Sequence, residues 1–194
     1  MLQLLYLLFT VSGAAGLMYE SIWSRYLGLF VGHSAYAQII VLVMFLGGMS
    51  VGAWAVGRRS AGLADPLRWY ALVELGAGAL GVLFHPLFVG VTGVAYSTLF
   101  PALPAGAPVV VAKWLIAALL ILPQSVLLGA TFPLMAAGAL RRVPERAGRT
   151  IALLYFANSL GAAAGVLVAG FAFIARYGLL GTLAAAAASV PSSP

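Results

Sequence analysis

Charged residues are scarce in this sequence of 194 residues: they make up 7% of it, where a soluble domain carries about 25%. A soluble fold with so few charges could not cover its surface, which excludes the soluble classes. Cysteine is absent, which excludes disulfides and thiolate metal sites. Apolar residues make up 63%, and they form long uncharged runs that match the thickness of a bilayer. Composition therefore predicts an integral membrane protein.

Motifs of soluble enzymes are also missing. The sequence contains no nucleotide-binding glycine loop after a strand, no phosphate-binding GK[ST] and no HExxH metal motif. His33 and His85 could in principle ligate a porphyrin metal or act as a pH switch, but they lack the spacing of paired ligands. We therefore expect no catalytic activity, no metal and no cofactor.

The apolar runs predict an all-α bundle of about six transmembrane spans in one domain, residues 1–190, with a short tail at 191–194. A bilayer crossing needs roughly 20 apolar residues. Five runs meet this length, whereas the sixth, at 179–190, is short for a full crossing. We expect residues 91–108, which contain three prolines, to form a loop with an interfacial turn. The five long runs are 2–30, 35–57, 69–90, 109–140 and 150–175.

The basic residues lie at the ends of these runs. Loop 58–68 contains three arginines and loop 141–149 contains four, so together they hold seven of the ten Lys and Arg, whereas 31–35 and 91–108 contain none. The positive-inside rule then predicts a cytoplasmic N-terminus. Basic residues at span ends favour anionic lipid headgroups as partners over nucleic acid, whose binders gather basic residues on one solvated face. The expected lipid contacts are Arg58, Arg59, Arg141, Arg142, Arg146 and Arg149.

Small residues at four-residue spacing predict close helix packing. The second run carries Gly48 and Gly52, and the fifth carries Gly161 and Gly165. The two stripes also suggest a weak internal repeat of spans 1–3 in spans 4–6, the three-plus-three arrangement found within half of a major-facilitator transporter. The alternative is that glycine-rich spans are simply common in membranes.

Polar residues inside the spans are the functional candidates, because burying them is costly. Glu20 lies deep in the first run between Tyr19 and Trp23, and a carboxylate beside aromatic rings could hold an organic cation. We include Gln124, near the middle of the fourth run, among the candidate ligand-binding residues. Interhelical hydrogen bonding is the alternative for this amide.

Structural ion pairs are the alternative for the carboxylates. Glu20 could pair with Arg25 or Lys113 instead of holding a ligand or a proton. Glu74, about five residues inside the third run, is expected to pair with an arginine of the loops, such as Arg68 or Arg142. Both alternatives follow from the cost of an unpaired charge in a membrane.

Four stretches carry a family resemblance: SGAAGLMYESIWSR at 12–25, FLGGMSVG at 45–52, LGATFPL at 128–134 and YFANSLGAAAG at 155–165. Together they resemble the membrane domain of bacterial spermidine synthase-like proteins, a major-facilitator-like domain fused to a synthase domain. The resemblance implies a multi-pass protein of the bacterial inner membrane. In that family a soluble aminopropyltransferase-like domain would follow, but this sequence stops at Pro194, so the enzymatic residues have no positions here.

The leading functional hypothesis is a small transporter-like or small-molecule-binding bundle without catalytic activity, and an amine is the candidate ligand. Half a transporter would need to dimerise to enclose a pathway, so we expect a homo-oligomer or a subunit of a larger membrane complex. Two alternatives stay open. One is a non-transporting accessory subunit that packs against a larger membrane complex, and the other is the membrane anchor of a truncated or split spermidine synthase-like enzyme.

Overall fold

The computed structural model describes residues 2–32 and 34–188; His33 and the predicted tail at 191–194 lie outside the described residues. Within them the chain is almost entirely helical and contains no strand, which confirms the predicted all-α bundle. Five helical segments are long and apolar enough to cross a membrane. The five predicted long spans are therefore confirmed.

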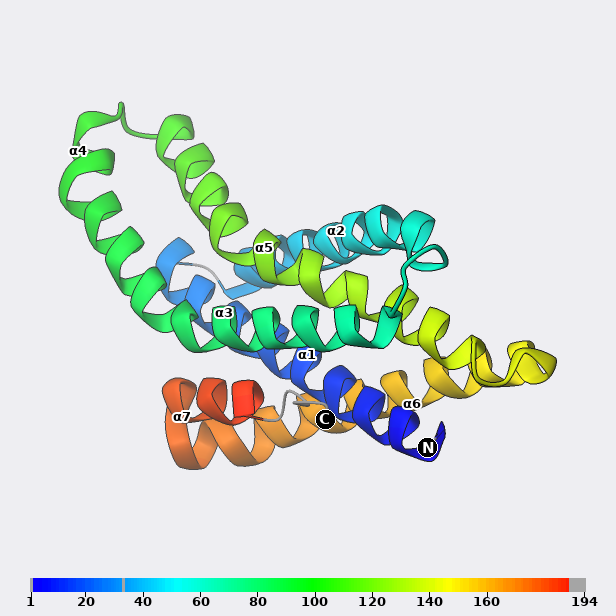
Figure 1. The fold of residues 1–194 in the computed structure, drawn as a ribbon. Coiled ribbons are helices and arrows are strands. Elements are labelled where there is room, and N and C mark those ends of the chain that lie inside the picture. Colours follow the sequence, from blue (N-terminus) through cyan, green and yellow to red (C-terminus); the bar gives the residue numbers. More distant parts are fainter. Residues whose placement is uncertain (1, 33, 189–194) are drawn as a thin grey trace.

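The helices follow one another with short connections (Figure 1). The π-helical segments are η1 and η3, and η2 is a single 3₁₀ turn. In chain order the elements are α1 (Leu2–Val31), α2 (Ser34–Ser60), α3 (Pro66–Val94), η1 (Ala95–Leu99), α4 (Phe100–Ala102), α5 (Ala107–Leu140), η2 (Pro144–Arg146), α6 (Ala147–Val168), η3 (Ala169–Phe173) and α7 (Ile174–Ala188).

The third helix begins earlier and ends later than its hydropathy suggested. At its start the Asp65 side chain accepts a hydrogen bond from the Arg68 N–H, and Pro66 occupies the first turn, so a polar cap and a proline begin the helix. At its other end the helix continues through η1 to Ala102. The predicted loop over residues 91–108 is therefore too long: residues 91–102 are helical, with aromatic side chains packed on Phe30, and the turn is confined to residues 103–106.

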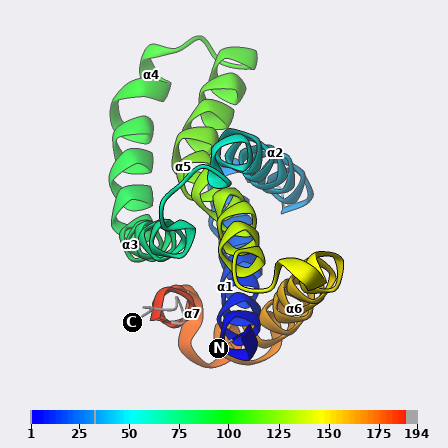
Figure 2. The ribbon, with the colours of Figure 1, turned by 45° about the vertical axis from the view of Figure 1, so that its right-hand side comes forward.

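Helices α1 and α5 are central in the bundle, and the other long helices pack against them (Figures 1 and 2). Helix α6 runs along α1, and α2 runs along α5. In the same way α7 contacts α1, and α3 contacts α5. The internal repeat matches α1 with α5, α2 with α6 and α3 with α7. Under this exchange the pair α1–α6 becomes α5–α2 and the pair α1–α7 becomes α5–α3, so the observed contacts have the symmetry that the repeat predicts. A unit of three spans crosses the membrane an odd number of times, so its second copy is inverted.

The glycines of the two stripes lie where the helices approach most closely. A Cβ atom added at Gly161 or Gly165 would overlap the backbone of α1. At Gly52 it would overlap the backbone of α5, and at Gly48 it would lie 2.6 Å from the Ser125 Cβ. These four positions therefore allow the helix pairs α1–α6 and α2–α5 to form.

Helix α7 contains a sharp reversal. Gly178 has φ 66° and ψ −172°, a conformation that other residues rarely adopt. The chain before it continues the line of α6 and η3, and the chain after it folds back as a short helix (Figure 1, orange to red). From Gly178 to Ala188 the helix rises roughly 15 Å, about half the hydrocarbon thickness. The predicted sixth segment is thus helical but, as described to Ala188, too short for a full crossing.

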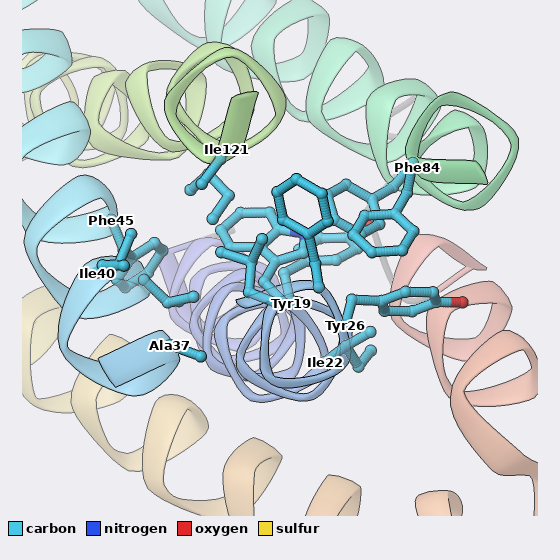
Figure 3. Close-up of a cluster of buried hydrophobic side chains, with 14 of the residues drawn as sticks. Tyr19, Ile22, Tyr26, Ala37, Ile40, Phe45, Phe84 and Ile121 are labelled. Atoms are coloured by element: carbon cyan, nitrogen blue, oxygen red, sulfur yellow. The ribbon is translucent and has the colours of Figure 1, made fainter. Parts of the chain in front are cut away.

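Aromatic side chains fill the core between α1 and α3. Tyr19 and Trp23 stack with ring centroids 6.0 Å apart, and Trp23 lies 5.9 Å from Phe84. The Tyr26 ring meets Phe84 edge-on at 5.4 Å. Figure 3 shows Tyr19, Tyr26 and Phe84 converging between the helices, with Ile121 reaching in from α5. The aromatic neighbours of Glu20 in the sequence therefore belong to the core.

Candidate functional site

A group of polar side chains lies inside this core, where α1, α3 and α5 meet. Glu74 of α3 is 0% exposed, and the Ser12 hydroxyl of α1 donates a hydrogen bond to Glu74 Oε1. From α5, Gln124 Nε2 donates to the Ala77 carbonyl oxygen of α3 at 2.8 Å. Hydrogen bonds across helices are a main source of adhesion inside membranes. Glu74 is thus held at the junction of three helices.

Several atoms of this group have no hydrogen-bond partner, which is unusual for buried polar groups. They include Glu74 Oε2, and the Tyr70 hydroxyl is directed at the same carboxylate without completing a hydrogen bond. The others are Tyr19 Oη, Trp23 Nε1 and Gln124 Oε1. Ser12, Tyr70 and Glu74 face one another, and we call these three residues the Glu74 cluster.

The predicted ion pair between Glu74 and a loop arginine is wrong. Among the described residues no basic side chain lies within ion-pair distance of Glu74. The reason is the face of α3 that carries it, which packs against α1 and α5. Arg68 and Arg142, in contrast, are exposed at the end of the bundle.

A cavity of about 510 Å³ leads from that end toward the cluster. Tyr70 is one of its lining residues, together with the charged Asp65, Arg68 and Arg142 and several apolar side chains of α1, α3 and α5. Because Tyr70 touches both this cavity and the Glu74 carboxylate, its ring separates the carboxylate from the cavity.

Glu20 lies on another side of α1. It lines an open cavity of about 760 Å³ between α1, α2, α6 and α7, together with Arg25, Ser21, Ser24 and Gln38. Tyr19 and Trp23 are 0% exposed and face the core, so they are not part of this cavity. The sequence-based ligand site therefore divides: Glu20 faces the cavity, whereas Tyr19, Trp23 and Gln124 are buried in the core between α1, α3 and α5.

The predicted ion pairs of Glu20 are also wrong. No ion pair joins Glu20 to Arg25 or Lys113 in the described part of the chain, although Glu20 and Arg25 line the same cavity. Residues five apart on a helix point in directions about 140° apart, which keeps these two charges from meeting directly.

Lys113 instead lies in a box of aromatic rings. Its Nζ is 5.6 Å from the ring centroid of Phe30 and 5.8 Å from those of Tyr96 and Phe100. A cation over several ring faces is stabilised by their quadrupoles. The four-residue spacing of Tyr96 and Phe100 was the available signal, but it fell in a segment that we expected to be a loop.

Arg141 joins the two basic loops. Its guanidinium donates to the carbonyl oxygens of Ala61, Leu63 and Ala64 at 2.8, 2.5 and 2.8 Å. The loops therefore lie at the same end of the bundle, and we call this the arginine-rich end. The guanidinium of Arg141 binds protein carbonyl groups. Binding of lipid headgroups stays a prediction for the other five arginines: Arg58, Arg59, Arg142, Arg146 and Arg149.

Neither site has the composition of a metal centre, since the described residues contain no group of three His, Asp or Glu side chains. No protein-family model, curated protein or solved structure matches this chain. The resemblance to spermidine synthase-like proteins therefore stays a prediction.

Proposed function

We propose that this protein is a transporter-like membrane bundle that binds a small zwitterionic molecule, one that carries an ammonium group and an anionic group, in the cavity of Glu20 and Arg25. One observation carries the proposal: this cavity is lined by a carboxylate and a guanidinium that form no ion pair with each other. A volume of about 760 Å³ is within the roughly 300–1,000 Å³ typical of ligand pockets.

The physical reason is the cost of uncompensated charge. Ionised groups within a membrane need an opposite charge or hydrogen bonds, because hydrocarbon cannot solvate them. A ligand ammonium would neutralise Glu20, and its carboxylate or phosphate would accept hydrogen bonds from Arg25, whose planar fork suits either anion. The hydroxyl of Ser21 and the amide of Gln38 offer further hydrogen bonds in the same cavity.

This proposal revises the amine hypothesis drawn from the sequence. A cation–π site for an amine needs ring faces open to the ligand, but Tyr19 and Trp23 are buried in the core. Arg25 would also repel a ligand that carried positive charge alone. A ligand with both charges avoids this repulsion.

We further propose that the arginine-rich end faces the cytoplasm, with the N-terminus on the same side, in a bacterial inner membrane. The two loops that hold seven of the ten basic residues meet at this end through Arg141, so their charges act together at one membrane surface.

Binding can be tested by calorimetry on the purified chain in lipid nanodiscs, with glycine and phosphoethanolamine as the probes. Nanodiscs with and without phosphatidylethanolamine distinguish a free zwitterion from a lipid headgroup, since a bound headgroup would compete with phosphoethanolamine. We expect binding that weakens at least about tenfold in Glu20→Gln and in Arg25→Gln, the loss of one charge-assisted interaction each. Glu145→Gln, in an exposed turn, is the matched control. No binding of either probe, or binding unaffected by both cavity variants, would favour the accessory-subunit or anchor alternatives.

A further inference from the structure

We infer that Glu74 is a proton-binding site that exchanges its proton with the arginine-rich end of the bundle through Tyr70. The inference does not depend on the zwitterion cavity, which is lined by other residues. It is carried by two observations: a fully buried carboxyl group with an unpartnered oxygen, and a cavity that reaches Tyr70 from the end of the bundle.

A buried carboxylate must be neutralised. Leaving an ionised carboxylate in a low-dielectric interior without a counter-ion costs far more than one or two hydrogen bonds recover. The described residues offer Glu74 no basic partner, and Ser12 alone donates a hydrogen bond to it. Glu74 therefore needs a cation from outside the chain, which is either a proton or a metal ion.

The geometry favours the proton. A Ca²⁺ ion takes six to eight oxygen ligands and Mg²⁺ takes six, so both need space among several oxygens. Here the Ser12 hydroxyl bonds directly to the carboxylate, with no room for an ion between them. Neither of the two cavities described above is lined by Glu74, Ser12 or Gln124. A proton needs no cavity.

The groups that face Glu74 suit both protonation states. When Glu74 is protonated, its O–H can donate to the Tyr70 hydroxyl oxygen; when it is ionised, the Tyr70 O–H can donate to Oε2 instead. The Ser12 hydroxyl remains a donor to Oε1 in either state. Only a reorientation of the Tyr70 hydroxyl separates the two arrangements.

The other elements around α3 bring no competing charge to the site. Helix α1 contributes Ser12 and Tyr19, and α5 contributes Gln124, all of them neutral. On α7, which also contacts α3, the titratable side chain that the structure describes is Arg176, and it is exposed. The nearest charged groups on the route are Asp65, Arg68 and Arg142, and they line the outer part of the cavity.

Proton exchange follows from this arrangement. The Tyr70 hydroxyl oxygen is itself buried, so exchange requires a transient swing of the Tyr70 side chain that brings this oxygen to the cavity. A hydronium ion there gives one proton to the Tyr70 hydroxyl oxygen, and the tyrosine passes its own proton to Glu74 Oε2. Tyr70 is unchanged after this step, one water molecule is left, and the carboxylate has become a carboxylic acid. The reverse step releases the proton to the same end.

Infrared difference spectroscopy of the whole chain in nanodiscs tests the site, because a protonated carboxyl group has its own C=O stretching band. We expect a pH jump to produce a band from a buried carboxylic acid that is absent in Glu74→Gln and retained in Glu145→Gln. In Tyr70→Phe the band should still form, but roughly 100-fold more slowly, since a positioned acid–base group speeds proton transfer by about that factor or more. The same bands in sodium-free and sodium-containing buffers would show that no metal ion competes.

The route can be tested separately, because the chain has no native cysteine. Leu8 lines the cavity of Tyr70, so Leu8→Cys labelled with a bulky thiol reagent should slow the band's appearance by a similar factor. Ala102→Cys, labelled at the opposite end, should leave the rate unchanged. A band that is missing from the wild type, or that persists in Glu74→Gln, would overturn the inference. A rate unaffected by both Tyr70→Phe and the Leu8 label would overturn the route, even if Glu74→Gln should fail to fold.

Discussion

Two glycines five residues apart on α2 offer a sharp test of the packing. A Cβ atom at Gly52 would lie 2.9 Å from the Val126 carbonyl carbon and 3.1 Å from the Ala130 nitrogen, and closer still to the Val126 carbonyl oxygen. At Gly47 the same atom would meet nothing within 4 Å. The two positions share a helix, a membrane environment and a substitution, so their difference isolates the contact with α5.

The expected magnitude follows from these distances. Non-bonded heavy atoms are most stable about 3.5–4.0 Å apart, and the Val126 carbonyl oxygen is the closest atom to the added Cβ, so Gly52→Ala requires α2 and α5 to separate by roughly 1 Å or more. A gap of about 0.5–1 Å removes a quarter to a half of the dispersion energy of each neighbouring contact. We therefore expect Gly52→Ala to lower the free energy of unfolding by about 1–3 kcal/mol, the range typical of overpacking. Gly47→Ala should be neutral or about 0.5 kcal/mol stabilising, because glycine loses more conformational entropy than alanine when the chain folds into a helix.

The assay is reversible unfolding of the purified protein in mixed detergent micelles, with helix content measured by circular dichroism. Gly161→Ala provides an independent comparison, since its Cβ would overlap the Thr10 backbone in the equivalent α1–α6 pair. Equal stabilities of the Gly52→Ala and Gly47→Ala variants would refute the argument, because close approach would then contribute nothing to the fold.

Two further predictions concern the membrane and the family. Cysteines at Ala61 and Gly148, both exposed at the arginine-rich end, should resist an impermeant thiol reagent in intact cells, while one at Ala102 should react; the opposite pattern would reverse the proposed orientation. The purified chain should form no spermidine from decarboxylated S-adenosylmethionine and putrescine above a heat-killed control, since its four acidic residues do not form a water-filled polyamine pocket together. Turnover that follows the protein through purification would contradict this.

The class of this protein and the positions of its spans could be predicted from the amino-acid sequence. Hydrophobicity, helix length and the absence of charge are properties of each segment alone, so five spans follow from the printed residues. The packing role of the glycine pairs could also be predicted. The four-residue spacing places Gly48 and Gly52 on one face of α2, and Gly161 and Gly165 on one face of α6, whichever helix packs against them. The loop predicted at 91–108 was too long because the helix over residues 91–102 packs on Phe30, a residue more than 60 positions away.

Which polar residues contact one another depends on how the helices pack, and the sequence did not predict it. Glu20 and Tyr19 are neighbours in sequence, but a rotation of about 100° per residue sends them to a cavity and to the core. Glu74 acquires Ser12 as its partner from a helix 62 residues away. How each helix is rotated about its axis is fixed by the summed packing of its neighbours, since polar groups are too few in these spans to set it. No short stretch of sequence shows the outcome of this packing. It buries the Glu74 carboxyl group beside Ser12, where the sequence predicted an ion pair with a loop arginine.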